Sequence, residues 1–445
     1  MAGACGGGAG TVARSPHSGG SGHPSKTSGV RLVETPTVSS KPSDEPVPAH
    51  PPLAQIASKR AKIDRQVDVL TVREPLGQSL IRRFILEGRE ISLQPIDRAL
   101  SEAARKAASA RSTITHFVPC HLMTALEPAC FNLGPVTFIR KSEFRRLLAQ
   151  HLWSTRAEQR KNRKPIGDGI SYYKTFGWVA QVTIVDCDKP TSKLMAERTV
   201  TAALNCIHLV FGTSHNRKMV VGGPALQHDR RGGFTIEGGN LHVEAQYGWP
   251  GAVGVEDDWI KYLNDDEGRH IVELCGIALE AAVDPTKERP LSDRFLDAAH
   301  WYGEAVREMS APAKVIKYVT ALERMFMTDE KDNIADTVAE RVATFCFDPS
   351  VTGDFERTKD CAKKAYDLRS RLAHGSMSPS DPTVWDGVRL GAELGQQALL
   401  AGLDAFEAEG LREEAIGRKR VAEWFQAAVG HGELVRSNLA ATADE

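Results

Sequence analysis

The sequence predicts an α+β N-terminal domain followed by an all-α helical bundle, behind a disordered N-terminal tail. Three observations carry this prediction. Residues 1–52 contain 9 Gly, 8 Pro, 8 Ser and 4 Thr. Apolar, β-branched segments bounded by Gly and Pro mix with a few helical segments between about 65 and about 260. Beyond about residue 262, helical periodicity replaces the strand pattern and the connections are short.

The tail is predicted to be disordered because its composition cannot bury enough apolar area to offset the entropy of ordering. A chain of 445 residues is long enough for two or three domains. We therefore divide it into a tail (1–60), a mixed α/β regulatory or sensing domain (61–285), a helical bundle (286–410), and a C-terminal helix and tail (411–445).

The N-terminal domain opens with two weakly alternating segments, VDVLTVREP and REISLQPIDRAL, which predict strands with a helix after the second. Further strands are predicted for THFVPCHL, GPVTFIRK and GWVAQVTIVDCD. The segment SEFRRLLAQHLW predicts a short amphipathic helix with Ser142 as its N-cap, and 192–211 predicts a long helix. The last strands of the domain, joined by tight glycine turns, are predicted for KMVVGGP, GGFTIEGG and LHVEAQYGWPG.

The bundle is predicted from segments with helical periodicity, which are HIVELCGIALEAAV, LSDRFLDAAHWYGEAVREM, APAKVIKYVTALERMFM, NIADTVAERVATFCF, GDFERTKDCAKKAYDLRSRLAH and PTVWDGVRLGAELGQQALLAGLDAFEAEG. In the fifth segment, Asp354 is a good N-cap, and Gly375 suits the left-handed position that ends a helix. This leaves His374 at the helix terminus.

The overall composition is that of an ordinary soluble globular protein, with 41% hydrophobic and 25% charged residues. A net charge of −1 excludes a polycation, so nucleic-acid contacts must come from a local patch. The 8 cysteines form no Cys-x-x-Cys pair, which predicts reduced thiols in a cytoplasmic protein. We see no secretory signal and no transmembrane segment of about 20 apolar residues. Walker, dinucleotide-binding and nucleophile-elbow patterns are missing too, and we predict neither a cofactor nor a metal site.

The segment YDLRSRLAHGS places Arg369 and His374 five residues apart at the end of a helix, which corresponds to about 140° of rotation. The two side chains can cooperate if the helix opens at His374, or if a two-fold dimer brings two copies of this end into one cleft. Such a cleft suits RNA cleavage without a metal, since histidine moves protons near neutral pH and arginine stabilises charge on the phosphorus oxygens. Capping by basic residues at a helix C-terminus explains the pair equally well.

The same segment resembles the signature of HEPN domains, specifically the Apea-like branch, whose helix ends in a Tyr-x-x-Arg-Ser-x-x-x-His-Gly pattern. The matching residues are Tyr366, Arg369, Ser370, His374 and Gly375. The upstream segments HWYGEAV, KYVTALERMF and TVAERVATF also resemble this family, in the expected order. The resemblance covers roughly 288–410.

The resemblance implies a helical bundle that dimerises. In many members the bundle is a metal-independent endoribonuclease of toxin–antitoxin, abortive-infection or other antiviral systems. Arg369 and His374 would then be the catalytic pair, and Ser370 would fill the polar position where Asn, Asp or His is often found. Other members have lost activity and act as binding scaffolds. A further group is modified by a nucleotidyltransferase antitoxin on a tyrosine just after the histidine, where this chain has Gly375 and Ser376.

Two residues are candidates for supporting the pair. Glu323 lies within a stripe of apolar residues, so it should be partly buried and in need of a partner, for which Arg369 is a candidate. It either orients the arginine or makes a structural or solvated contact. Tyr366 lies one turn before Arg369, where packing is favoured over chemistry.

A basic segment in the N-terminal domain is a candidate RNA-binding site. Residues 140–174 hold 10 Lys and Arg against 3 acidic residues. Basic residues near aromatic ones can follow a phosphate backbone and stack bases, although a mobile charged loop has the same composition. The candidate contacts are Arg156, Arg160, Lys161, Arg163 and Lys164.

These observations give three hypotheses. The first is an RNA-cleaving HEPN homodimer, an effector of prokaryotic antiviral defence or abortive infection. Its N-terminal domain would sense a phage-derived trigger or bind an antitoxin, without membrane contact. The second is a catalytically silent HEPN module for dimerisation and binding. The third makes the N-terminal domain a binder of a small molecule or peptide, with the bundle as its scaffold.

Overall fold

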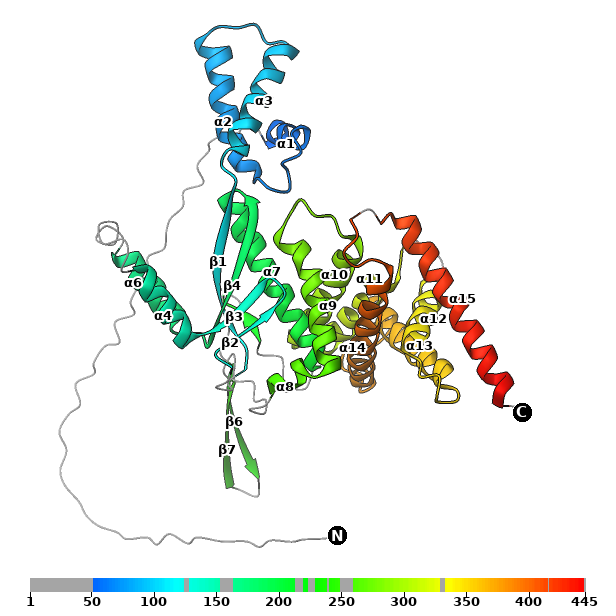
Figure 1. Ribbon diagram of the computed structural model, residues 1–445. Helices are drawn as coiled ribbons and strands as arrows, with labels where there is room; N and C mark the ends of the chain where they lie inside the picture. Colours follow the sequence, from blue (N-terminus) through cyan, green and yellow to red (C-terminus); the bar gives the residue numbers. More distant parts are fainter. Residues whose placement is uncertain are drawn as a thin grey trace, which may run out of the picture. The chain divides into compact units, whose positions relative to one another are not determined.

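The computed structural model describes residues 51–123, 128–152, 163–212, 219–222, 229–237, 240–248, 259–328, 333–414 and 416–443 (Figure 1). By its internal contacts the chain divides into two units, Met1–Pro48 and Ala49–Glu445. Every described residue belongs to the second unit. That unit contains a group of N-terminal helices, a small antiparallel sheet and a larger set of C-terminal helices, which agrees with a mixed N-terminal half followed by a helical one.

The N-terminal helices are α1 (Pro51–Arg60), α2 (Val69–Leu80), the π-helix η1 (Ile81–Leu86) and α3 (Leu93–Ala108). They enclose a hydrophobic core of their own. Residues 51–60, which we assigned to the disordered tail, are helical, and Ala54 and Ala57 are buried in this core. That part of the tail prediction is therefore wrong.

The strands predicted for VDVLTVREP and REISLQPIDRAL are also wrong, because these segments form α2 and the start of α3. Asp68 caps α2 by accepting a hydrogen bond from the Leu70 amide at 2.8 Å. Val72 and Leu76, one helical turn apart, are both fully buried. Burial of this helical face outweighs the strand preference of the β-branched residues.

A five-stranded antiparallel sheet follows, in the order β2-β3-β4-β1-β5. Its strands are β1 (Ser112–His121), β2 (Cys130–Leu133), β3 (Val136–Arg140), β4 (Trp178–Cys187) and β5 (Val220–Val221). The strands predicted for THFVPCHL, GPVTFIRK and GWVAQVTIVDCD are thus confirmed. β1 and β4 pair along most of their length, with Val118 opposite Ala180.

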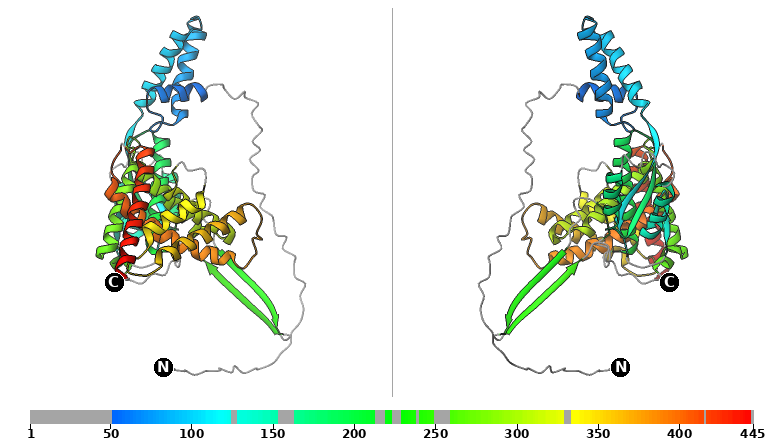
Figure 2. Two further views of the ribbon diagram at one scale, coloured as in Figure 1. Left: turned by 90° about the vertical axis from the view of Figure 1, so that its right-hand side faces the viewer. Right: turned by 90° about the vertical axis from the view of Figure 1, so that its left-hand side faces the viewer.

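Three further elements belong to this half. Helices α4 (Lys141–Leu152) and α6 (Arg163–Tyr173) lie between β3 and β4 in the chain. Because α4 already begins at Lys141, Ser142 lies inside its first turn, and the N-cap prediction is wrong. The predicted strands β6 (Asp229–Glu237) and β7 (Asn240–Gly248) form a two-stranded hairpin (Figure 2).

Helix α7 (Lys189–Phe211) confirms the long helix predicted for 192–211 and packs against both the sheet and the C-terminal helices. Asp188, 1% exposed, caps it by accepting the Thr191 amide at 3.0 Å. Its other oxygen accepts the Asp68 amide at 3.0 Å and the Thr71 hydroxyl at 2.5 Å. One buried carboxylate therefore joins α2 to the start of α7.

The C-terminal helices are α8 (Trp259–Asn264), α9 (Asp266–Val283), α10 (Pro290–Arg307), α11 (Ala311–Phe326), α12 (Ile334–Cys346), α13 (Asp354–Ala373), α14 (Val384–Glu409) and α15 (Arg418–Ala443). One contiguous core joins strand residues such as Trp178 to helix residues such as Tyr302 and Phe406. Helix α14 comes close to α11 at Gly391, where a Cβ atom would lie 2.8 Å from the Cβ of Tyr318. None of the helices in the described ranges has the length and apolarity that crossing a membrane demands.

Helix α13 begins one residue earlier than predicted, at Asp354, so the N-cap prediction for Asp354 is wrong. Gly353 precedes the helix in a left-handed conformation with φ of 74°. The Asp354 carboxylate instead accepts the Asp348 amide at 2.7 Å, which fastens the preceding loop to the helix.

Candidate active site at the end of helix α13

Helix α13 ends as the sequence predicts. His374 is the last near-helical residue, with φ of −88° and ψ of 0°, and its amide donates to the Ser370 carbonyl at 2.9 Å. Gly375 follows with φ of 71°. The Ser376 amide then donates to the Arg371 carbonyl at 3.0 Å and the Gly375 amide to the Leu372 carbonyl at 3.3 Å, the two bonds of a Schellman end. The helix therefore does not open before His374.

Arg369 lies in the body of α13 and pairs with Glu323 on α11. Its Nη2 donates to the Glu323 Oε2 at 3.3 Å, and the two side chains are 26% and 20% exposed. This is the pairing that we expected from the burial of Glu323. Because both groups keep some access to solvent, the pair is neither fully buried nor a freely moving surface contact.

Tyr366 packs one turn before the arginine. The Arg369 guanidinium carbon lies 5.6 Å from the centroid of the Tyr366 ring, within the range of a cation–π contact. Burial, followed by the negative charge of Glu323, raises the pKa of the Tyr366 phenol. Tyr366 therefore stays protonated and acts as a packing surface beneath the arginine, which agrees with the expected packing role.

The Nε atom of Arg369 is buried and has no hydrogen-bond partner among the described residues. Only one of the guanidinium nitrogens is engaged by Glu323. Because Nε is buried, Nη1, which makes no hydrogen bond among the described residues, is the donor left for a phosphate or carboxylate oxygen. The arginine is thus held by Glu323 and Tyr366 while part of its donor set stays available.

His374 and Ser370 complete the predicted set. His374 is exposed and Ser370 is half-buried. Since α13 remains helical up to His374, the separation of about 140° from Arg369 holds, and the two side chains do not share a face within one chain. The structure brings Arg369, Glu323 and Tyr366 together, and leaves His374 facing solvent at the helix end.

The end of the bundle that carries His374 also exposes large apolar side chains. Leu368 and Met377 flank His374 in the chain and pack with Val315 and Val384 into a small core. Trp385, next to Val384, is 65% exposed. Met309, two residues before the start of α11, is 62% exposed. An exposed tryptophan and methionine around one end of a bundle are typical of a contact surface.

The basic segment cannot be placed in the same way. Arg156, Arg160 and Lys161 lie outside the described residues. Arg163 and Lys164 belong to the first turn of α6, but only their helical backbone is described. The RNA-binding prediction for these five residues therefore stays a prediction.

Sequence reasoning missed a buried polar cluster between α7 and α10. Asn205 and His208 are both fully buried. Arg307 donates to the Asn205 Oδ1 at 2.9 Å and contacts the His208 Nδ1 at 3.2 Å, while its other nitrogen donates to Glu304 at 2.8 Å. The sequence signal was an Asn-x-x-His spacing on the apolar face of α7, but its arginine partner lies about a hundred residues later.

Sequence reasoning also missed a group with metal-ligand chemistry. The Nε2 of His270 on α9 lies 2.8 Å from an Asp404 oxygen and 3.7 Å from a Glu407 oxygen, both on α14. Within the described part of the chain, this group has the atoms to hold a metal ion. The carboxylates are exposed, and a hydrogen bond from His270 to Asp404 accounts for the arrangement without an ion.

No protein-family model matches the chain, and neither a curated protein nor a solved structure matches it significantly.

Proposed function

We propose that the chain is a metal-independent endoribonuclease of the HEPN type, in which two copies form one cleft and Arg369 and His374 are the catalytic residues. The observation that carries the proposal is the arrangement at the end of α13. An arginine held by Glu323 and Tyr366 keeps its Nη1 without a hydrogen bond among the described residues, and an exposed histidine lies at the end of the same helix. By resemblance, the setting is a cytoplasmic effector of prokaryotic antiviral defence or abortive infection.

The proposed reaction needs only protons and charge stabilisation. His374 takes the proton of an RNA 2′-hydroxyl, and the 2′-oxygen bonds to the adjacent phosphorus. The bond from phosphorus to the 5′-oxygen of the next nucleotide breaks, and that oxygen takes up a proton from water, while His374 later returns its proton to the solvent. The products are a 2′,3′-cyclic phosphate and a 5′-hydroxyl end. Arg369 stabilises the extra negative charge on the phosphorus oxygens in the transition state.

A second chain is required because the geometry of one chain separates the two residues by about 140°. A two-fold axis near the end of α13 sets the Arg369 of one copy facing the His374 of the other. The exposed Trp385 and Met309 supply apolar area for this contact. Glu323 positions Arg369, and Ser370 fills the polar position beside it.

The test is cleavage of labelled RNA by the purified full chain in excess EDTA. We expect cleavage by the wild type and at least a 100-fold loss, on the order of what a general acid–base or charge-stabilising group contributes, for both His374→Ala and Arg369→Ala. Arg371→Ala is the matched control, since Arg371 lies on the same helix end, is 47% exposed and, among the described residues, forms its one ion pair with Asp367. Cleavage that survives in both site variants contradicts the proposed site.

A catalytically silent HEPN module for dimerisation and binding is the second candidate. The observation that favours it is the ion pair of Arg369 with Glu323, which gives the arginine a structural partner in the absence of any substrate. A wild-type chain that dimerises through the end of α13, cleaves no RNA and does not arrest growth on overexpression would support this function instead of the nuclease.

A further inference from the structure

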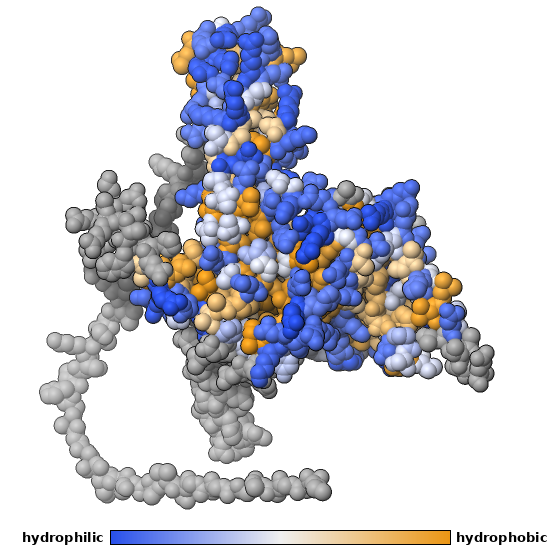
Figure 3. Space-filling view, viewed as in Figure 1, coloured by the Kyte–Doolittle hydropathy of each residue, from blue (hydrophilic) through white to orange (hydrophobic). Residues whose placement is uncertain are grey.

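The N-terminal helices end in an exposed aliphatic tip, which we define as Ile85, Leu86, Ile91 and Leu93. These residues flank the turn between η1 and α3 and are 72%, 76%, 74% and 81% exposed. Figure 3 shows hydrophobic residues among hydrophilic ones at this end of the N-terminal helices. Four large aliphatic side chains within nine residues of chain, all in solvent, are typical of an interaction site.

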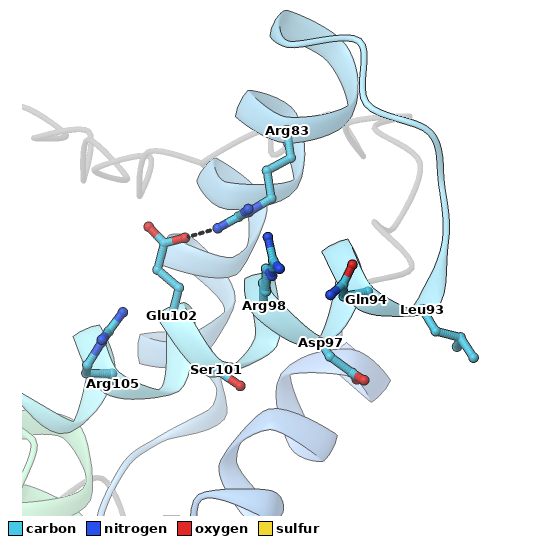
Figure 4. A pocket seen from close by; sticks show the side chains of 8 residues that line it. All are labelled: Arg83, Leu93, Gln94, Asp97, Arg98, Ser101, Glu102 and Arg105. Carbon is cyan, nitrogen blue, oxygen red and sulfur yellow. Dashed lines mark hydrogen bonds and ion pairs between the residues drawn. The ribbon is translucent and has the colours of Figure 1, made fainter.

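A groove runs from this tip along α3 (Figure 4). It has a volume of about 750 Å³ and lies between η1 and one face of α3. The residues that line it are Arg83, Leu93, Gln94, Asp97, Arg98, Ser101, Glu102 and Arg105. From Leu93 to Arg105 the groove follows about 18 Å of helix, which is the length of about 12 residues of a second helix.

The two carboxylates in the groove are already paired. Glu102 accepts hydrogen bonds from Arg83 at 2.8 Å and from Arg82 at 2.9 Å, and the Arg83 bond is the main reason that its pKa falls to about 2. Asp97 pairs with Arg60 at 2.7 Å. The acidic groups therefore offer nothing to a cationic ligand.

Two arginines in the groove are left over. Arg98 and Arg105 lie one turn before and one turn after Glu102, and both are exposed. Neither makes an ion pair or a side-chain hydrogen bond within the described part of the chain. In Figure 4, Arg98 points to the same side of α3 as Gln94, toward Arg83. The groove therefore presents two uncommitted positive charges next to an aliphatic tip.

The N-terminal helices as a whole also carry a positive charge. Residues 51–111 hold 12 Lys and Arg against 7 Asp and Glu, a net charge of +5, whereas the whole chain carries −1. Single-stranded RNA is disfavoured because no aromatic side chain lines the groove to stack its bases. Insertion of the tip into a membrane is disfavoured because Glu87 and Glu90 lie in its turn.

We propose that this groove is the docking site for an acidic amphipathic helix of a partner protein. The acidic side chains of that helix pair with Arg98 and Arg105, and its aliphatic side chains cover the exposed tip. Helix-in-groove binding combines these two features, with anchors repeated at intervals of three and four residues. The proposal does not depend on nuclease activity, and its test measures binding only.

The experiment uses fluorescence anisotropy with the full chain and a labelled helical peptide of about 15 residues that carries Glu and Leu on one face. We expect saturable binding with a dissociation constant of about 10 μM, which weakens as salt is added. A second peptide, with Lys in place of Glu, should bind at least about tenfold more weakly, because it faces the same arginines.

Two variants of the chain locate the site. Arg98→Glu combined with Arg105→Glu should weaken binding of the Glu peptide at least about tenfold, and Leu86→Ser combined with Leu93→Ser should do the same. The control is Lys59→Glu, an exposed charge on α1 outside the groove that changes the net charge in the same direction. Thermal unfolding checks that all variants are folded.

Three results overturn the proposal. The first is no saturable binding of the Glu peptide by the wild type. The second is binding that the double arginine variant leaves intact or that Lys59→Glu weakens equally. The third is tighter binding to phosphatidylserine vesicles or to single-stranded RNA than to the peptide, lost in the same double variant, since the groove would then serve a different class of ligand.

Discussion

Two regions of this molecule combine an arginine with a histidine, in contact in one region and five residues apart on one helix in the other, and they differ in their surroundings. Between α7 and α10, Arg307 contacts the fully buried His208 and Asn205 and also binds Glu304. At the end of α13, Arg369 binds Glu323, and His374 stands in solvent. The residue types are the same, but the histidine of the first region is buried in the protein and the histidine of the second is exposed to solvent.

The difference separates a structural role from a chemical one. In the buried cluster, Gly303 gives Asn205 its space, since a Cβ atom there would lie 2.1 Å from the Asn205 Oδ1. Such a cluster holds α7 against α10, and its histidine and asparagine are buried away from any substrate. At the end of α13, the Nη1 of Arg369 makes no hydrogen bond among the described residues, and His374 is exposed to solvent. The predictions below test this contrast.

The largest effect on stability is expected in the buried cluster. Arg307→Met leaves the buried Asn205 without the arginine donor and Glu304 with only the longer contact to Lys317 at 3.7 Å, so we expect the free energy of unfolding to fall by about 3 kcal/mol. Urea denaturation measures the change. Arg324→Met is the control, because its pair with Asp297 is exposed and should contribute only about 0.5 kcal/mol. Equal losses of unfolding free energy in the two variants would show that the buried cluster stabilises the fold no more than an exposed ion pair does.

The next effect concerns dimerisation. Trp385→Ser removes a large exposed apolar side chain close to His374 in the chain. We expect the dimer dissociation constant to rise about 30-fold, which corresponds to a loss of about 2 kcal/mol in association free energy. Sedimentation velocity over a concentration series measures it. Trp301→Ser, on α10 and 38% exposed, is the control and should leave the dissociation constant unchanged. A dissociation constant that rises in Trp301→Ser and not in Trp385→Ser would contradict an interface at the end of α13.

A smaller effect is expected for the residue that holds the arginine. Glu323→Gln keeps the shape of the side chain but removes the charge that orients Arg369. We expect the maximal rate of RNA cleavage to fall about tenfold with little change in KM, because a mispositioned group acts less well in the transition state. Asp297→Asn, which changes an exposed arginine pair elsewhere, is the control. A Glu323→Gln variant with wild-type rate would reduce Glu323 to a structural contact.

The smallest effect is a shift in the titration of His270. Its hydrogen bond to Asp404, with the nearby charges of Glu407 and Glu273, raises its pKa above the ordinary value of 6.5. The protonated form is therefore favoured in the folded state, so its stabilising contribution is present below pH 6.5 and is lost as the pH rises through the raised pKa. NMR titration of the His270 ring should show a lower pKa in Asp404→Asn than in the wild type. No difference between the two proteins would exclude the Asp404 bond in solution.

Much of the sheet and of α13 could be predicted from the sequence because local signals were strong there. The β-branched run of β4 and the Gly375 end of α13 each follow from short segments. Glu323 was expected to pair with Arg369 because a carboxylate within an apolar stripe needs a partner, and α11 and α13 do pack together.

The failures have physical causes as well. The segment of α2 alternates like a strand, but its conformation depends on Val72 and Leu76 packing against the neighbouring helices α1 and α3. The contacts of Asp188 with α2 and of Arg307 with α7 join residues about a hundred positions apart. Such contacts depend on tertiary geometry, which periodicity and spacing do not contain.

The most direct test of the central claim, that two chains each supply half of one active site, is a mixing experiment. Arg369→Ala and His374→Ala chains are co-expressed, and the unseparated mixture of dimers is compared with each parent in RNA cleavage with excess EDTA. Random pairing makes about half of the dimers mixed, each with one intact composite site of two, so we predict about a quarter of the wild-type rate. A mixture as inactive as its parents, alongside an active wild type, would show that Arg369 and His374 act within a single chain and would contradict the account.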